Sequence, residues 1–156
     1  LELNARAAAI AELVVWIGYL QWHYRNTTGH PQEPILRAFE NINFGKRDGY
    51  DAVLTWDGYP APKVENGVET YPNARRPMWP EAEFIVGNPP FIGGKDIRSR
   101  TEPGYAEALW AAHPQMNESA DYVMYWWDRA AETIASSNTK TRRFGLVTTK
   151  TLAQDF

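Results

Sequence analysis

The sequence contains no cysteine among its 156 residues. Disulfide bridges and thiolate metal sites are therefore excluded, and the cytoplasm is the default expectation for the protein's location. Histidine is scarce as well: His23, His30 and His113 show no metal-ligand spacing with carboxylates. We therefore expect no metal site.

The chain also lacks an excess of positive charge. Lys and Arg number 16 against 19 Asp and Glu, which gives a net charge of −3. This balance argues against a polybasic tail and against a protein that binds nucleic acid by bulk electrostatics. It still allows a local basic patch.

Long apolar runs are missing too. The most apolar stretch, residues 7–20, contains Glu12 and is shorter than the roughly 20 apolar residues of a membrane span. No basic segment precedes an apolar one, so no targeting signal is visible. The sequence has no Gly-Lys-Ser/Thr phosphate loop and no serine in a nucleophile elbow. We expect no membrane partner, and neither P-loop nor serine-hydrolase chemistry is indicated.

Aromatic residues, in contrast, are abundant, with seven Trp, eight Tyr and six Phe. Hydrophobic residues make up 44% of the chain and charged residues 22%, which is the composition of a globular domain. Aromatic side chains fill protein cores and also stack on planar ligands such as bases, and both uses stay open.

The apolar periodicity predicts helices in three places. The longest runs from Asn4, its N-cap, to about Arg25, and its broad apolar face indicates that it is sandwiched between other elements. The others cover residues 104–112 and about 120–136.

Between the helices, the sequence predicts strands and two long loops. A buried strand is expected at residues 83–87 and further strands at 41–44 and 143–149. Residues 57–80, rich in Pro, Gly and Asn, are predicted to form a long loop or flap, and residues 92–103 a second polar loop.

This order of elements favours an α/β fold with a doubly wound, mostly parallel sheet. The strands ending at Glu2, residues 43–44, Gly87 and Thr149 are predicted to share that sheet, with parallel neighbours. In such sheets ligands bind beyond the carboxyl ends of the strands, which directs attention to polar residues at those ends.

The most informative strand end carries the residues Asn88-Pro89-Pro90-Phe91. The prolines have no N–H to donate, so the turn offers carbonyl acceptors, and Asn88 adds a side-chain acceptor. Two acceptors suit a planar exocyclic amine, and Phe91 can stack on the ring that bears it. The alternative is an ordinary proline turn, but the apolar strand before it and the aromatic after it favour a functional site.

This motif resembles that of amino-methyltransferases that use S-adenosylmethionine, especially N6-adenine DNA methyltransferases. The wider pattern is similar to large restriction–modification proteins of the type IIG or MmeI-like kind. The segments that carry this resemblance are residues 85–95 (Ile-Val-Gly-Asn-Pro-Pro-Phe-Ile-Gly-Gly-Lys), 120–126 (Ala-Asp-Tyr-Val-Met-Tyr-Trp) and 1–8 (Leu-Glu-Leu-Asn-Ala-Arg-Ala-Ala).

The resemblance implies roles for particular residues. Glu2 would bind the ribose hydroxyls of the cofactor, and Asp51, with Asp48 as a competitor, would contact its adenine amino group. Tyr122 would lie near the cofactor, although its position in an apolar stripe equally suits a core residue. The basic residues that would contact DNA phosphates, or else form a solvated loop, are Lys95, Arg98 and Arg100. Lys150 departs from the family pattern, where asparagine is expected.

The implied reaction is methyl transfer from S-adenosylmethionine to N6 of an adenine flipped out of double-stranded DNA. The family fold is a class I, Rossmann-like methyltransferase, and its first strand, with the glycine-rich cofactor motif, would precede Glu2. We therefore expect residues 1–156 to be a fragment of one catalytic domain that is inactive alone and binds the cofactor poorly. The alternatives are a protein glutamine methyltransferase, which usually has tyrosine where Phe91 stands, and a non-catalytic interaction module on the same fold. The oligomeric state is not encoded in any of these features.

Overall fold

The computed structural model describes residues 1–27 and 50–150. These residues belong to two compact units, 1–51 and 52–156, and each unit is described by itself. The strand predicted at residues 41–44 lies outside the described residues, as does Asp48.

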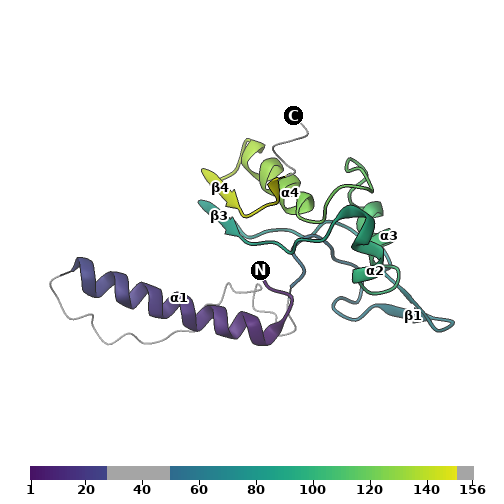
Figure 1. Ribbon diagram of the computed structural model, residues 1–156, viewed down its shortest axis with the longest axis horizontal. Coiled ribbons are helices and arrows are strands. Elements are labelled where there is room, and N and C mark those ends of the chain that lie inside the picture. Colours follow the sequence, from purple (N-terminus) through teal and green to yellow (C-terminus); the bar gives the residue numbers. More distant parts are fainter. Residues whose placement is uncertain (28–49, 151–156) are drawn as a thin grey trace. The chain divides into compact units, whose positions relative to one another are not determined.

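The first unit contains the helix α1 (Ala5–Asn26), drawn in purple in Figure 1. Its N-cap is Asn4, whose Oδ1 accepts the N–H groups of Arg6 at 2.9 Å and Ala7 at 3.1 Å. At the other end the N–H of Thr27 donates to the carbonyl of His23. Both predicted ends are confirmed, because local capping chemistry sets them.

The expected burial of α1 is wrong for the described residues. Ala8 is its only buried residue, whereas Leu13, Val14 and Val15 are 58%, 60% and 53% exposed. These consecutive apolar residues point to different sides of the helix, so they do not form one stripe. The described part of this unit also contains no second helix or strand that could cover them.

The second unit contains a parallel strand pair, β3 (Phe84–Gly87) and β4 (Arg143–Leu146). Their register pairs Phe84 with Arg143 and Gly87 with Leu146, so both carboxyl ends lie at one edge. The two predicted strands and their parallel pairing are confirmed. Residues 1–3 form no strand, and no other described strand joins this pair, so the predicted larger sheet is not observed.

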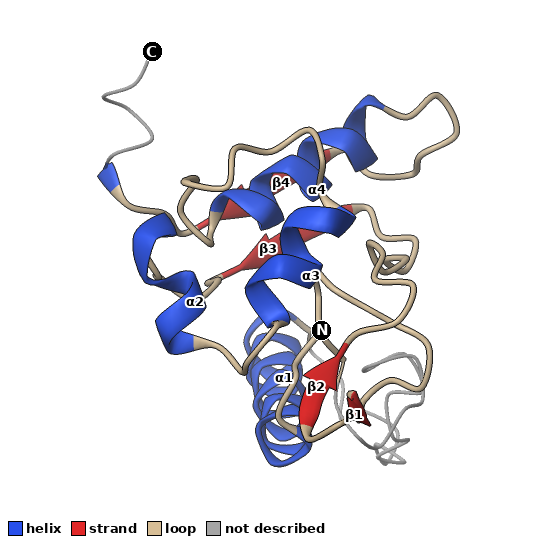
Figure 2. Ribbon diagram, turned by 90° about the vertical axis from the view of Figure 1, so that its right-hand side faces the viewer, coloured by secondary structure: helices blue, strands red, loops and turns tan. Residues whose placement is uncertain are grey.

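The predicted burial of β3 is also wrong. Phe84 is 58% exposed and Val86 is 82% exposed, and both point to the same face because strand side chains alternate. The helix α4 (Met124–Ala135) covers the opposite face, as Figures 1 and 2 show. Its Trp127 packs edge-to-face on Phe144 of β4, with ring centroids 4.9 Å apart.

The region predicted to be one long loop contains a β-hairpin, formed by β1 (Lys63–Glu65) and β2 (Val68–Thr70). The turn between them is Asn66-Gly67, with φ of 53° and 78°. Positive φ at both positions is the geometry that Asn-Gly adopts in two-residue hairpins. The Asn-Gly pair therefore overrides the Pro- and Gly-rich composition around it.

The remaining helices contribute to a core of mixed aliphatic and aromatic side chains. The predicted helix at 104–112 is confirmed as α3 (Tyr105–Ala112), whereas the polar loop before it contains a 3₁₀ turn, η2 (Gly94–Asp96), and a short helix, α2 (Ile97–Arg100). Fully buried side chains from several segments meet here: Val53, Leu54, Ile97, Leu109 and Tyr125. None of the described helices is long and apolar enough to cross a membrane.

Candidate active site

The 88–91 turn directly follows β3, at the edge where the parallel strands end. Asn88 and Pro90 are exposed, Pro89 is buried, and Phe91 is 48% exposed. The turn is thus anchored through Pro89, while the amide of Asn88 and the ring of Phe91 are accessible. An accessible amide and an accessible aromatic ring three residues apart can bind a planar ligand through hydrogen bonds and stacking.

Backbone contacts fix the chain on both sides of this turn. On the upstream side, the N–H of Val147 donates to the carbonyl of Gly87 at 3.0 Å. Downstream, the carbonyl of Ile92 accepts the N–H of Tyr122 at 2.8 Å, and Oδ1 of Asp121 accepts the N–H of Gly94 at 3.1 Å. Two of the three segments that carry the family resemblance, 85–95 and 120–126, are therefore in direct contact.

Tyr122 is a core residue in this structure. Its side chain is buried, its hydroxyl is 2.7 Å from that of Tyr105, and its ring packs edge-to-face on Trp126. The core interpretation made from the sequence agrees with this burial. A contact between Tyr122 and a cofactor stays a prediction.

The basic residues predicted to contact DNA fall into two groups. Nε of Arg98 is 2.6 Å from Oε1 of Glu107, and its guanidinium lies 4.9 Å from the centre of the Trp110 ring. The pKa of Glu107 is lowered, by its own backbone N–H and by Arg98. Lys95 and Arg100 are exposed, and neither has an ion-pair partner among residues 1–27 and 50–150.

The predicted cofactor residues Glu2 and Asp51 both belong to the first unit. The N–H of Tyr50 donates to the carbonyl of Glu2 at 2.8 Å, which brings the two chain segments side by side. Glu2 Oε1 also accepts the N–H of Asn4 at 2.9 Å, and Asp51 is buried with 6% exposure. Carboxylates in neighbouring segments suit a ligand that offers hydroxyl and amine donors.

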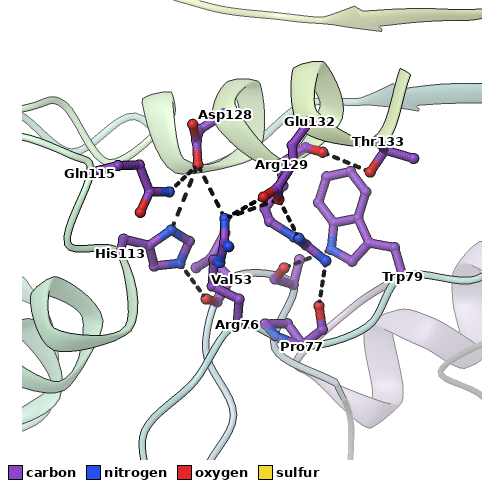
Figure 3. A network of polar contacts seen from close by, with 11 residues as sticks. Val53, Arg76, Pro77, Trp79, His113, Gln115, Asp128, Arg129, Glu132 and Thr133 are labelled. Carbon is purple, nitrogen blue, oxygen red and sulfur yellow. Dashed lines mark hydrogen bonds and ion pairs between the residues drawn. The ribbon is translucent and has the colours of Figure 1, made fainter. Parts of the chain in front are cut away.

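A charged cluster that sequence reasoning missed holds α4 against the segment before β3 (Figure 3). Both carboxylate oxygens of Glu132 lie 2.9 Å from Nη1 of Arg76, and Oε2 also binds Nη1 of Arg129 at 2.6 Å. Arg129 further donates to the carbonyl of Pro77 at 2.8 Å. The charges compensate one another, so this cluster is a structural clamp. None of the predicted site residues lines the open hollow beside it.

His113 lies under the same clamp and is 1% exposed. Its Nε2 is 2.8 Å from the carbonyl of Val53, which only accepts, so the neutral ring carries its proton on Nε2. Nδ1 has no hydrogen-bond partner in the described residues and lies 4.0 Å from Oδ2 of Asp128. Burial, above all, lowers the pKa of His113.

The model of one family, the DNA-methyltransferase domain of MmeI, matches residues 1–155. The chain belongs to this MmeI methyltransferase family. No curated protein and no solved structure matches the chain. The match covers segments 85–95 and 120–126, which contact each other next to the 88–91 turn. It confirms the MmeI-like resemblance seen in the sequence. The activity of an MmeI-type domain is methyl transfer to DNA, so DNA is the substrate class.

Proposed function

We propose that this domain transfers a methyl group from S-adenosylmethionine to N6 of an adenine flipped out of duplex DNA, as part of a restriction–modification protein. The 88–91 turn is the observation that carries the proposal. It lies at the carboxyl edge of a parallel strand pair and exposes an amide and an aromatic ring. Parallel α/β sheets bind their ligands at this edge.

The chemistry of an adenine amine fits the groups that this turn offers. The two N–H bonds of the amine need two acceptors, which are Oδ1 of Asn88 and the carbonyl of Pro89. When acceptors hold both N–H bonds, the lone pair of the amine nitrogen is less delocalised into the adenine ring. The nitrogen is then more nucleophilic. Phe91, 48% exposed, stacks on the base and orients it. Catalysis by such a turn depends on positioning and on preorganised polar groups.

The cofactor would be held by the first unit. Carboxylate oxygens of Glu2 would accept the ribose hydroxyls, and Asp51 would accept the adenine amino group, since both are acceptors in adjoining segments. Tyr122 is proposed to lie near the cofactor. When bound, S-adenosylmethionine supplies the methyl group as an electrophile.

Contacts to the DNA backbone would come from Lys95 and Arg100, which are exposed in the segment after the turn. Phosphate contacts of this kind position the duplex without reading its sequence. Arg98 would join them only after leaving Glu107 and Trp110.

The test is an Asn88→Ala variant of the intact protein. We expect a loss of about 3 kcal/mol of transition-state stabilisation, or roughly a hundredfold in kcat, with cofactor affinity largely retained. The assay uses tritiated cofactor and duplex DNA, with mass spectrometry of the nucleosides to identify N6-methyladenine.

The matched variant is Glu2→Gln, which keeps an oxygen that can accept the N–H of Asn4 but removes the charge. It should weaken cofactor binding first. Near wild-type turnover in Asn88→Ala would refute the role of the turn, and methylated cytosine in place of adenine would refute the proposed substrate.

A further inference from the structure

The position of the 88–91 turn is set by the buried Pro89 and by residues outside the turn. Asn88, Pro90 and Phe91 are exposed, and Pro89 is the only residue of the turn that is buried. The upstream end is fixed by the pairing of β3 with β4. The downstream end is fixed by the two hydrogen bonds that Ile92 and Gly94 make with Tyr122 and Asp121.

Gly94 approaches the neighbouring backbone more closely than any other amino acid could. A Cβ atom at Gly94 would lie 2.0 Å from the carbonyl oxygen of Ser119 and 2.8 Å from that of Ala120. Both are backbone atoms, so no side-chain rotation relieves the clash. At Gly93, by contrast, the nearest atoms to a Cβ are carboxylate oxygens of Asp121 and Asp96, each at an ordinary 3.8 Å.

The segment against which Gly94 packs is itself rigidly placed. Tyr122 and Val123 follow Asp121 directly, and both are buried in the core. Because Asp121 is joined to this buried segment, its backbone is held in place, and its Oδ1 accepts the N–H of Gly94. Removing that acceptor leaves the second bond, from Tyr122 to Ile92, in place. Residues 92–94 would therefore become more mobile but would stay hydrogen-bonded to Tyr122 through Ile92.

We propose that Asp121 is a positioning residue for methyl transfer, which acts by fixing Gly94 and thereby the 88–91 turn. This inference rests on the proposed function of the turn. Asp121 does not need to touch the base, because its effect passes through the Gly93-Gly94 loop that connects it to Phe91. Misplacement of a reacting group by about 1 Å can reduce a rate about a hundredfold.

Two variants of the intact protein, Asp121→Ala and Asp121→Asn, distinguish the hydrogen bond to Gly94 from the negative charge of Asp121. Asparagine keeps an Oδ1 that accepts the Gly94 N–H, whereas alanine removes the acceptor. We expect Asp121→Ala to lower kcat about tenfold to a hundredfold with little change in the KM for DNA. Asp121→Asn should stay within about threefold of the wild-type kcat. Equal losses in the two variants would overturn the inference.

A second pair of variants tests the close approach at Gly94. Gly94→Ala should lower kcat by at least as much as Asp121→Ala, because its Cβ would displace the loop from Ser119. Gly93→Ala is the control and should leave kcat within about threefold. A Gly94→Ala variant with wild-type kcat would overturn the inference.

Hydrogen exchange measured by mass spectrometry gives a readout that does not depend on activity. Peptides covering residues 88–96 should exchange faster in Asp121→Ala than in the wild type, while peptides from α4 stay unchanged. If the wild-type protein makes no N6-methyladenine, the proposed function fails, and this measurement alone decides on Asp121. Unchanged exchange in residues 88–96 would then overturn the inference.

Discussion

The buried His113 predicts that the protein loses stability in mildly acidic solution. Its side chain is 0% exposed, and the hydrogen bond that its Nε2 donates to the carbonyl of Val53 is satisfied in the neutral state. A second proton would have to go on Nδ1, which is buried and has no hydrogen-bond partner within residues 1–27 and 50–150. Burial is the main reason that the pKa of His113 is lowered from 6.5.

The charged groups around His113 act in both directions. From α4, Asp128 raises the pKa of His113 and Arg129 lowers it, and Arg76 from the preceding segment lowers it as well. The hydrogen bond to Val53 also raises it. Together these effects leave the pKa lowered, so the folded protein keeps the ring neutral at a pH where the unfolded chain protonates it.

The sign and size of the effect follow from proton linkage. Below about pH 6.5 the unfolded chain binds a proton at His113 that the folded protein does not, so the free energy of unfolding falls as the pH falls. Above about pH 7.5 the residue makes almost no pH-dependent contribution, because the unfolded chain no longer protonates it. Lowering the pH from 7.5 to 5.5 reduces the free energy of unfolding by at most about 1.4 kcal/mol, the limit in which the folded ring stays neutral throughout.

The measurement is urea denaturation at pH 5.5, 6.5 and 7.5, followed by tryptophan fluorescence. His113→Gln is the matched variant, because its side-chain N–H can still donate to Val53 but does not titrate in this range. Contributions of other groups are shared by both proteins and cancel in the difference. Parallel stability curves for the two proteins, or an NMR titration giving His113 a pKa of 6.5 or above, would refute the reasoning.

Three further predictions concern stability. Leu109→Ala should reduce the free energy of unfolding by about 2–5 kcal/mol in denaturant titrations, because Leu109 is 0% exposed and its loss leaves a cavity; a cost below 1 kcal/mol would show that this site is not in the core. Gly18→Ala in α1 should stabilise the protein by up to about 1 kcal/mol, because its Cβ would meet no atom of the described residues within 4 Å and alanine favours helix. Gly67→Ala, at φ +78°, should instead destabilise it, and equal shifts in melting temperature for the two alanines would contradict both assignments.

The features that could be predicted from the sequence are those set by adjacent residues. Asn4 fixes the start of α1 through N–H groups two and three positions away. The 88–91 turn ends β3 because neither proline can donate to a sheet. In each case the residue that determines the feature lies within a few sequence positions of it.

Features that depend on distant partners could not be predicted in this way. Asp121 and Gly94 are 27 positions apart, and His113 and Val53 are 60 positions apart. The exposure of Val86 was missed for a related reason, since an apolar strand pattern does not say whether both faces of the strand are covered. The Asn66-Gly67 hairpin is different: its signal is local, but the prediction for residues 57–80 follows their Pro-, Gly- and Asn-rich composition and does not use this pair.

The Asn-Pro-Pro-Phe motif determines the turn locally, but distant residues determine where the turn lies. Four adjacent residues form the turn, but its placement depends on a glycine at 94 that fits against Ser119 and on an acceptor at 121. A chain that kept the motif but carried a larger residue at position 94 would form the same turn in a displaced position. Such a chain should bind DNA and cofactor yet methylate slowly, because positioning contributes to the rate rather than to binding. The Asn-Pro-Pro-Phe turn together with Gly94 and Asp121 is therefore a stronger indication of methyltransferase activity than the turn alone.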